Sequence, residues 1–314
     1  MLVIIIQKGK NMCTAIRFNG RFFGRTLDFE SSFGEQIVAT PRESVTIGDG
    51  KNRYSILGVG AVSSGLPLYF DGVNEWGLSM AALSFPGYAV YGLGGGRSVS
   101  SSSLILMTLG LCRSLKEAGD MLQNIVISKE GDTDFGVTPL HWIISDPRSA
   151  MVVESFSGGL KLYDSPLGVL TNSPDYSYHM TRLSDCSCLS PKNPVDYIGK
   201  GLYSRGMGAI GLPGDFSSSS RFLRAAYIKE NMILSEHDED MGQAFMAISA
   251  MGIPRGAVIS NEGLPVYTRY TALIDMMEPA YHLSSPSCRT VRHIRLDDRL
   301  MTAPEIAAFP IYGN

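Results

Sequence analysis

Short apolar runs bounded by turn residues recur along the chain, and they predict a protein rich in β-strands. The clearest case is the segment 13–28, in which Asn19-Gly20 separates two mainly apolar runs. Asn-Gly in this setting is the strongest short-range signal of a β-hairpin. A second hairpin is predicted where 140–145 and 151–156 flank a turn cluster. Further strands are predicted at 54–62, 76–85, 159–163, 168–171, 268–276 and 290–296.

Apolar residues at helical spacing fall into two groups. Residues 102–112 are apolar on nearly all sides, as in a buried helix, and the capping box Ser114-Leu-Lys-Glu117 opens another helix after them. The second group is predicted at 217–231 and 236–251. Strands and helix pairs therefore alternate, whereas a parallel sheet would alternate single strands with single helices. We expect an α+β fold of antiparallel sheets with helices packed outside, in a single domain over 13–314.

Composition and charge exclude several classes of protein. Of the 314 residues, 44% are hydrophobic and 18% are charged, which is typical of a globular chain. The net charge of −3 and the lack of Lys/Arg runs argue against a nucleic-acid partner. No apolar run approaches the ~18 residues that a membrane span needs, so no membrane insertion is predicted. The apolar stretch Leu2–Ile6 is too short for a secretory signal. We expect residues 1–12 to be a leader or a mis-annotated start that the mature chain lacks.

The cysteine pattern indicates a reducing compartment. The chain has five cysteines, at positions 13, 112, 186, 188 and 288. An odd number scattered through a long chain without a signal peptide is typical of free thiols, and it predicts a cytoplasmic protein. Cys186-Ser187-Cys188 lacks the further Cys or His residues at matched spacing that a zinc site needs. We predict neither a metal nor a cofactor.

Two other motifs are better explained by structure than by chemistry. The glycine-rich stretch Tyr91–Arg97 lacks the Gly-Lys-Ser/Thr ending of a phosphate-binding loop and is interpreted as a surface loop. His141 lies in a predicted strand beside Trp142. A histidine in that position is interpreted as a core residue with its hydrogen bonds satisfied, ahead of a general base.

Cys13 is the strongest candidate for chemistry. It follows Met12 directly, so removal of Met12 would leave Cys13 as the first residue. A terminal cysteine carries a nucleophilic thiol and an α-amine whose pKa is about 7.7–8.0. Such an amine can act as general base for its own thiol, without a histidine. By position alone, a small buried residue at the start of a strand is an equally good interpretation.

Several blocks of sequence together point to a known family. The blocks are Met12–Ile16 with Phe23–Asp28, Asp71–Leu78, Leu140–Trp142, Gly168–Pro174, and Gly211–Phe216 with Ser220–Phe222. In this order, over roughly residues 12–275, they resemble the choloylglycine hydrolase family, which contains conjugated bile salt hydrolases and penicillin V acylases. The resemblance implies an N-terminal nucleophile hydrolase, a four-layer αββα sandwich of two antiparallel sheets flanked by helices. It also implies a homotetramer.

The resemblance also implies roles for individual residues. Cys13 would be the nucleophile, with its own amine as base. Asp28 would hold that amine, and Arg25 would favour the thiolate. Asn172 and the backbone N–H of Ser84 would bind the oxyanion. Arg221 would order the site from the start of its helix.

Two features of the sequence do not agree directly with these family roles. An ideal two-residue Asn19-Gly20 turn pairs Cys13 with Thr26 and points Arg25 to the opposite face, so we expect a bulge or a strand end to intervene. The second feature is Ser84 in Leu-Ser-Phe-Pro. Bile salt hydrolases usually resemble Leu-Asn-Phe-Pro here and penicillin acylases tend to carry Tyr, so the substrate stays open.

The favoured function is hydrolysis of glycine- or taurine-conjugated bile salts, which are small amphipathic amides. Leu27, Phe70 and Leu140 are candidates for the walls of an apolar pocket, although ordinary core positions are an equally good interpretation. Arg205 is the candidate partner for the carboxylate or sulfonate of the leaving group, against the alternative of a solvated loop residue. The alternatives are penicillin V, N-acyl amino acids or acyl homoserine lactones as substrates, and an inactive binding protein on the same fold.

Overall fold

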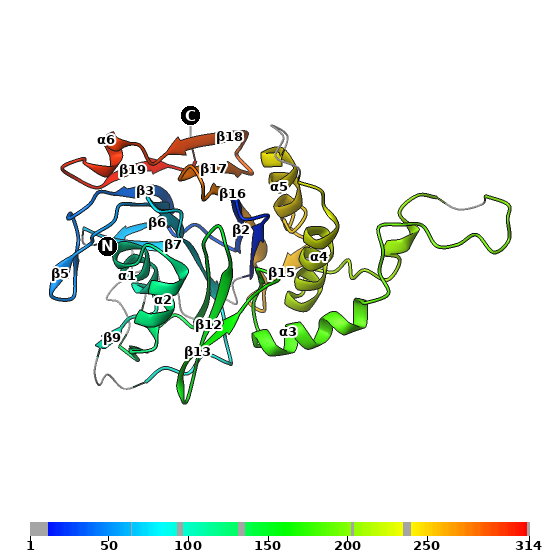
Figure 1. Ribbon diagram of the computed structural model, residues 1–314, viewed down its shortest axis with the longest axis horizontal. Coiled ribbons are helices and arrows are strands. Elements are labelled where there is room, and N and C mark those ends of the chain that lie inside the picture. Colours follow the sequence, from blue (N-terminus) through cyan, green and yellow to red (C-terminus); the bar gives the residue numbers. More distant parts are fainter. Residues whose placement is uncertain are drawn as a thin grey trace.

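The computed structural model describes residues 12–63, 65–92, 97–130, 136–201, 204–234 and 240–312. It is built around two antiparallel sheets (Figure 1). The first sheet has the strand order β14-β1-β2-β16-β17-β18, and β15 pairs with β16. Its strands are β1 (Met12–Phe18), β2 (Phe22–Phe29), β14 (Val169–Leu170), β15 (Val258–Ile259), β16 (Pro265–Asp275), β17 (Ala280–Ser285) and β18 (Cys288–Arg295). Of the expected leader, only Met12 lies within the described residues.

The second sheet has the order β13-β12-β11-β8-β7-β6-β3-β19. Its strands are β3 (Gln36–Thr40), β6 (Ile56–Ser63), β7 (Leu66–Asn74), β8 (Ser79–Ser84), β11 (Leu140–Ser145), β12 (Ala150–Phe156), β13 (Gly159–Asp164) and β19 (Ala307–Pro310). Two small two-stranded sheets lie outside it, formed by β4 (Thr46–Ile47) with β5 (Gly50–Lys51) and by β9 (Arg97–Val99) with β10 (Ile125–Ile127).

Helices cover the outer faces of both large sheets (Figure 1). The helices are α1 (Leu104–Leu111), α2 (Leu115–Leu122), α3 (Tyr176–Arg182), α4 (Ser218–Asn231), α5 (Asp240–Ser249) and α6 (Asp298–Met301), with 3-10 turns at Leu183–Cys186 and Met207–Ala209. Helices α1 and α2 pack on the second sheet in one apolar cluster with Met80, Trp142 and Ile144. Helices α4 and α5 pack on β1, β2 and β16. The layers therefore run helix, sheet, sheet, helix.

The predicted elements are present, with shifted ends and several omissions. Both predicted hairpins form, and the capping box is real, since the Ser114 hydroxyl accepts a hydrogen bond from the Glu117 N–H at 3.3 Å. The start of the helix predicted at 236–251 lies outside the described residues, as do 93–96 of the glycine-rich stretch. Strands β3, β7, β17 and β19 were not predicted. Strand β7 contains Pro67, and β17 is buried at every position, so neither shows the alternation that identifies a strand.

The register of the first hairpin corrects the expected two-residue turn. Cys13 pairs with Leu27, not Thr26, and Phe18 pairs with Phe22, so the turn contains three residues, Asn19–Arg21. Arg21 is held out of the ladder because its side chain binds Asp275 and its carbonyl accepts the Met276 N–H. This added residue brings Arg25 and Leu27 to the same face of the hairpin as Cys13, and no bulge within the hairpin is needed.

The described parts of the connection between α3 and α4, residues 183–201 and 204–217, form an arm that extends away from the layered body (Figure 1). Within the described ranges, no helix is long and apolar enough to cross a membrane.

Candidate active site

Cys13 lies at the start of β1 with its side chain between the two sheets and only 1% exposed. Its sulfur meets an apolar pocket. Leu27, Phe70 and Leu140, the three residues predicted as walls, all line this pocket together with Cys13. The remaining lining residues are Arg25, Phe33, Leu68, Tyr69, Ala82, Ser84, Ser102 and Thr138. The pocket therefore offers a mainly apolar surface that ends at one thiol.

Arg25 is the cation beside that thiol. Its Nη2 lies 3.5 Å from Cys13 Sγ and donates to the Ala82 carbonyl at 2.9 Å. Its Nη1 binds Asp71 Oδ2 at 2.6 Å, in an ion pair whose two side chains are 2% and 0% exposed. The guanidinium is thus held from two strands of the opposite sheet, β7 and β8, with one nitrogen directed at the sulfur.

Asp71, Tyr270 and Tyr281 form a buried cluster behind Arg25 that the sequence did not reveal. Both tyrosine hydroxyls donate to the Asp71 carboxylate, and Arg25 also contacts the Tyr270 hydroxyl. Asp71 belongs to one of the blocks resembling the family, which is a signal for it. The two tyrosines look like ordinary strand residues, and nothing in the sequence connects them with Cys13.

The electrostatic environment of Cys13 is mixed. Burial raises the pKa of the thiol, while the charge of Arg25 lowers it. Asp28 raises it further and Arg221 lowers it. Burial also works against the charge of Arg25, but Tyr270, Asp71 and Cys13 together raise its pKa above the ordinary value. Arg25 therefore stays charged, and it is the main favourable influence on a thiolate at this position.

Asp28 lies on the opposite face of β2, toward the helices. Its carboxylate accepts hydrogen bonds from Thr268 at 2.5 Å and Thr26 at 3.1 Å. Burial raises the pKa of Asp28 to about 6, against the lowering effect of the Arg221 charge. Asp28 is thus a buried carboxyl near the backbone of Cys13 that titrates close to neutrality.

Arg221 and Asn172 join the backbone of Cys13 to the rest of the site. Arg221, in the first turn of α4, donates to the Cys13 carbonyl, to Thr14 Oγ1 at 2.8 Å and to Asn172 Oδ1 at 2.7 Å. The same Asn172 oxygen accepts the Cys13 N–H at 2.9 Å, and Asn172 Nδ2 donates to the Ser84 carbonyl at 3.0 Å. Direct hydrogen bonds or a shared pocket therefore bring together five of the predicted residues, namely Cys13, Arg25, Asn172, Arg221 and Ser84.

Arg205 and His141 lie apart from this arrangement. Arg205 is exposed on the arm, and it does not line the pocket of Cys13. His141 is fully buried, and its ring nitrogens contact Glu154 Oε1 and the Thr171 carbonyl, both at 3.1 Å. The interpretation of His141 as a satisfied core residue is confirmed. The described residues contain no cluster of His, Cys, Asp or Glu that could hold a metal ion.

Comparison with known proteins identifies relatives over nearly the full chain. A bile salt hydrolase/transferase of Lactiplantibacillus plantarum is 32% identical, covering 96% of this chain and 97% of that protein. A conjugated bile acid hydrolase of Lactobacillus acidophilus is 31% identical, covering 95% of this chain and all of that protein.

Solved structures of similar proteins confirm the predicted αββα fold of an N-terminal nucleophile hydrolase. The conjugated bile acid hydrolase from Clostridium perfringens superposes with a TM-score of 0.85 at 28% identity, covering 95% of this chain and 96% of that one. The penicillin V acylase from Agrobacterium tumefaciens has a TM-score of 0.74 at 20% identity, covering 95% and 91%, and it supports the fold alone. The family model of linear amide C–N hydrolases, choloylglycine hydrolase family, matches residues 13–309, and the chain belongs to that family.

Proposed function

We propose that this hydrolase cleaves the amide bond of glycine- or taurine-conjugated bile salts through a thioester on Cys13. The observation that carries the proposal is the meeting of the Cys13 thiol and Arg25 at one end of an apolar pocket. The apolar lining is complementary in polarity to the apolar part of an amphipathic acyl group, and the relatives named for bile salts match nearly the whole chain. Leu27, Phe70 and Leu140 are the proposed contacts of the acyl group.

The proposed mechanism begins with proton transfer from the thiol of Cys13 to its own α-amine. The sulfur attacks the amide carbonyl, and the resulting oxyanion accepts hydrogen bonds from Asn172 Nδ2 and the Ser84 N–H. The C–N bond then breaks, and the amine returns the proton to the departing nitrogen. Water, deprotonated by the same amine, attacks the thioester and releases the carboxylic acid and the free thiol.

Three charged residues support these steps in the proposal. Arg25 favours the thiolate, since a cation near a sulfur lowers the pKa of the thiol. Asp28 holds the α-amine once it is free. Arg221 orders the site from the start of its helix, through its hydrogen bonds to the Cys13 carbonyl and to Asn172.

We further propose that the active form is one domain over 13–314, without residues 1–12. While Met12 is attached, the nitrogen of Cys13 is an amide that donates to Asn172 Oδ1 and has no lone pair to accept a proton. Cleavage or trimming after Met12 turns that nitrogen into the base. The experiment is intact-mass analysis of a preparation with measured turnover, and fully active protein that still carries Met12 would exclude the terminal-amine mechanism.

Ser84 lines the pocket beside Cys13, and it is the position at which this chain resembles neither bile salt hydrolases nor penicillin acylases. The substrate therefore has to be tested directly. Penicillin V is the second candidate substrate, and N-acyl amino acids or acyl homoserine lactones are further ones. The test assays the purified chain in parallel against glycocholate, taurocholate and penicillin V. We expect bile salt turnover to exceed penicillin V turnover. The reverse order would contradict the substrate proposal, and inactivity of the mature form on every amide would favour a binding protein.

We also propose that the protein is a homo-oligomer. The resemblance to the family implies a tetramer, and the arm between α3 and α4 supports an oligomer. Val195, Tyr197 and Ile198 on this arm are 71%, 92% and 74% exposed, and three large apolar side chains so close together are typical of a surface that binds a partner. All five cysteines lie in described parts of the chain and are free thiols, which supports a cytoplasmic location. Sedimentation analysis and fractionation test these two proposals.

A further inference from the structure

A second pocket lies on the helix-facing side of the first sheet, on the opposite face from the Cys13 sulfur. It is open, about 400 Å³ in volume, and bounded by the end of α5, strands β16 and β17, and the loop after β17. That volume suits a small organic ligand. The lining residues are Ser249, Gly252, Ile253, Pro254, Arg255, Tyr267, Thr268, Thr271, Ser284, Ser285, Pro286 and Arg289. None of them is acidic.

Two hydroxyl groups that line this pocket make no hydrogen bond to any residue that the structure describes. Thr271 and Ser284 are register partners across β16 and β17, and they are 8% and 6% exposed. Their hydroxyl oxygens are not among the fully buried unpaired atoms of the described residues, so both reach the open pocket and are available to a ligand. The hydroxyls therefore form an adjacent pair of donors facing the pocket.

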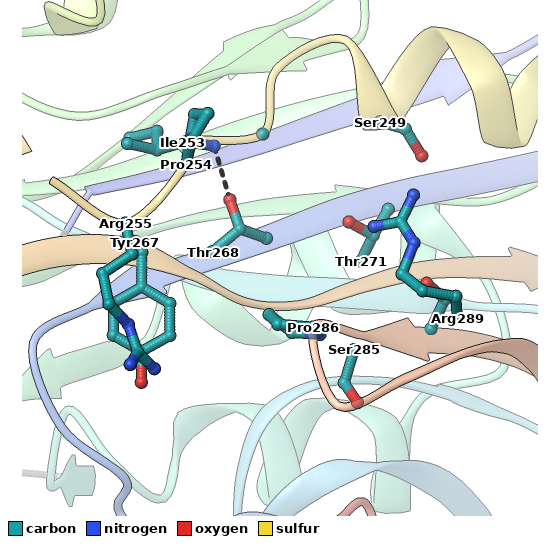
Figure 2. Close-up of a pocket in the computed structure, with 12 residues that line it drawn as sticks. Ser249, Ile253, Pro254, Arg255, Tyr267, Thr268, Thr271, Ser285, Pro286 and Arg289 are labelled. Carbon is teal, nitrogen blue, oxygen red and sulfur yellow. Dashed lines mark hydrogen bonds between the residues drawn. The ribbon is translucent and has the colours of Figure 1, made fainter. Parts of the chain in front are cut away.

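Arg289 supplies a positive charge above this pair. The β17–β18 ladder is interrupted between Leu283 and Ser285, and Arg289 lies in the unpaired stretch that follows Cys288. Such irregularities redirect side chains. Figure 2 shows the Arg289 guanidinium extending toward Thr271 and Ser249. Among the described residues, Arg289 has no recorded ion pair or hydrogen bond.

The rest of the lining is apolar or already engaged. Ile253, Pro254 and Pro286 give a hydrophobic wall, and Arg255 stacks on the Tyr267 ring at 4.2 Å. A cation, two free hydroxyls and an apolar wall, without an acidic group, are complementary to an organic anion.

We propose that this pocket binds a small organic carboxylate or sulfonate. Its head group accepts hydrogen bonds from Thr271, Ser284 and Arg289, and its apolar part lies on Ile253 and Pro286. The site is separate from the pocket that receives the amide substrate.

The pocket is connected to the catalytic centre through Thr268. The Thr268 hydroxyl accepts the Ile253 N–H at 2.7 Å (Figure 2). The same hydroxyl donates to Asp28 at 2.5 Å, so Ile253 helps to position the residue that binds the Asp28 carboxylate. Thr271 also pairs directly with Thr26, which binds Asp28 as well. A ligand that shifts β16 or Ile253 therefore acts on Asp28, and binding is expected to change the reactivity of Cys13.

The test is isothermal titration of the full chain with hexanoate, with inorganic sulfate as a competitor for the head-group position. We expect saturable binding that weakens at least about tenfold in Arg289→Ala and in Thr271→Val, because each removes a hydrogen bond to a charged group. Arg295→Ala is the matched control, because Arg295 lies on the same strand but is paired with Glu278, and it is expected to bind as the unaltered chain does. Equal affinity in Arg289→Ala, or no binding at all, would overturn the site.

The connection to Asp28 is tested by the rate at which iodoacetamide alkylates Cys13, a readout that does not depend on the natural substrate. Hexanoate is expected to change this rate in the unaltered chain and in Arg295→Ala but not in Arg289→Ala. A change that persists in Arg289→Ala belongs to hexanoate in the Cys13 pocket and contradicts the connection. An unchanged rate under saturating hexanoate contradicts it too.

Discussion

Replacing Asp71 by Asn tests whether the buried cluster behind Arg25 positions its guanidinium beside the Cys13 sulfur. The substitution keeps the shape of the side chain and removes its charge. Arg25 and Asp71 are 2% and 0% exposed, so the change leaves a buried guanidinium without its counter-ion. Breaking a buried pair by removing one partner costs about 3–5 kcal/mol. Domains are stable by about 5–15 kcal/mol, so Asp71→Asn is expected to fold with a clearly reduced urea midpoint.

Activity is expected to fall by more than the loss of folded protein explains. Arg25 Nη2 lies 3.5 Å from the sulfur because Nη1 is fixed on Asp71. A displacement of about 1 Å at a catalytic group can lower the rate about a hundredfold, and we expect a loss of that order in kcat/KM. The measurements are urea unfolding and steady-state kinetics on the folded fraction.

The pH dependence of Cys13 alkylation separates positioning from simple electrostatics. If Asp71 acts by holding Arg25 near the sulfur, its loss raises the pKa of Cys13 and moves alkylation to higher pH. If only the negative charge of Asp71 mattered, its removal would lower that pKa. Asp120→Asn is the control, because Asp120 forms an exposed pair with Lys116, and solvent screening makes such pairs contribute little to stability. An Asp71→Asn protein with wild-type kinetics and an unshifted alkylation profile would refute the positioning role.

The other predictions concern the nucleophile and its partners. Cys13→Ala should fold and lose essentially all activity, and Cys13→Ser should be very poor, because an amine of pKa near 8 activates an alcohol weakly; turnover above a few per cent of wild type would contradict the assignment. Burial raises the pKa of Asp28 to about 6, and its charged form is the one proposed to hold the amine, so kcat/KM should fall as Asp28 gains a proton, at about pH 6 or below. Asp28→Asn should be nearly inactive at every pH, and an unchanged acid limb in that variant would exclude Asp28 as its source. Arg205 is exposed on the arm, so Arg205→Ala measures whether the arm reaches a substrate, with a raised KM for both bile salt conjugates expected and an unchanged KM excluding the contact.

Much of the fold could be predicted because the apolar pattern and the turn residues agree with it. Asn19-Gly20 marked the first hairpin, and the capping box at Ser114 marked the start of α2. Strand β7 was not predicted, because Pro67 argues against a strand and because the residues of β7 are buried almost without alternation. That strand carries Asp71, so the same omission concealed part of the site.

The candidate site could be predicted only where the family blocks reach. Leu27 and Leu140 were named because they adjoin such blocks, and the pocket does bring them to Cys13. Tyr270 and Tyr281 come from strands of the first sheet, yet both bind an aspartate of the second. No sequence spacing encodes a contact between sheets, so only the packed structure could reveal this cluster.

The turn at Asn19–Arg21 has a consequence for how this protein tolerates changes of length. Connections between strands usually accept insertions and deletions. Here the pairing of β1 with β2 is what must be kept, because a shift of that pairing by one residue, such as Cys13 with Thr26, would exchange the two faces of β2. Arg25 and Leu27 would then turn toward the helices, and Asp28 would turn toward the sulfur. A shifted register would thus place a carboxylate instead of a cation beside Cys13, so mutagenesis libraries that vary the length of this turn should select for the pairing of Phe18 with Phe22.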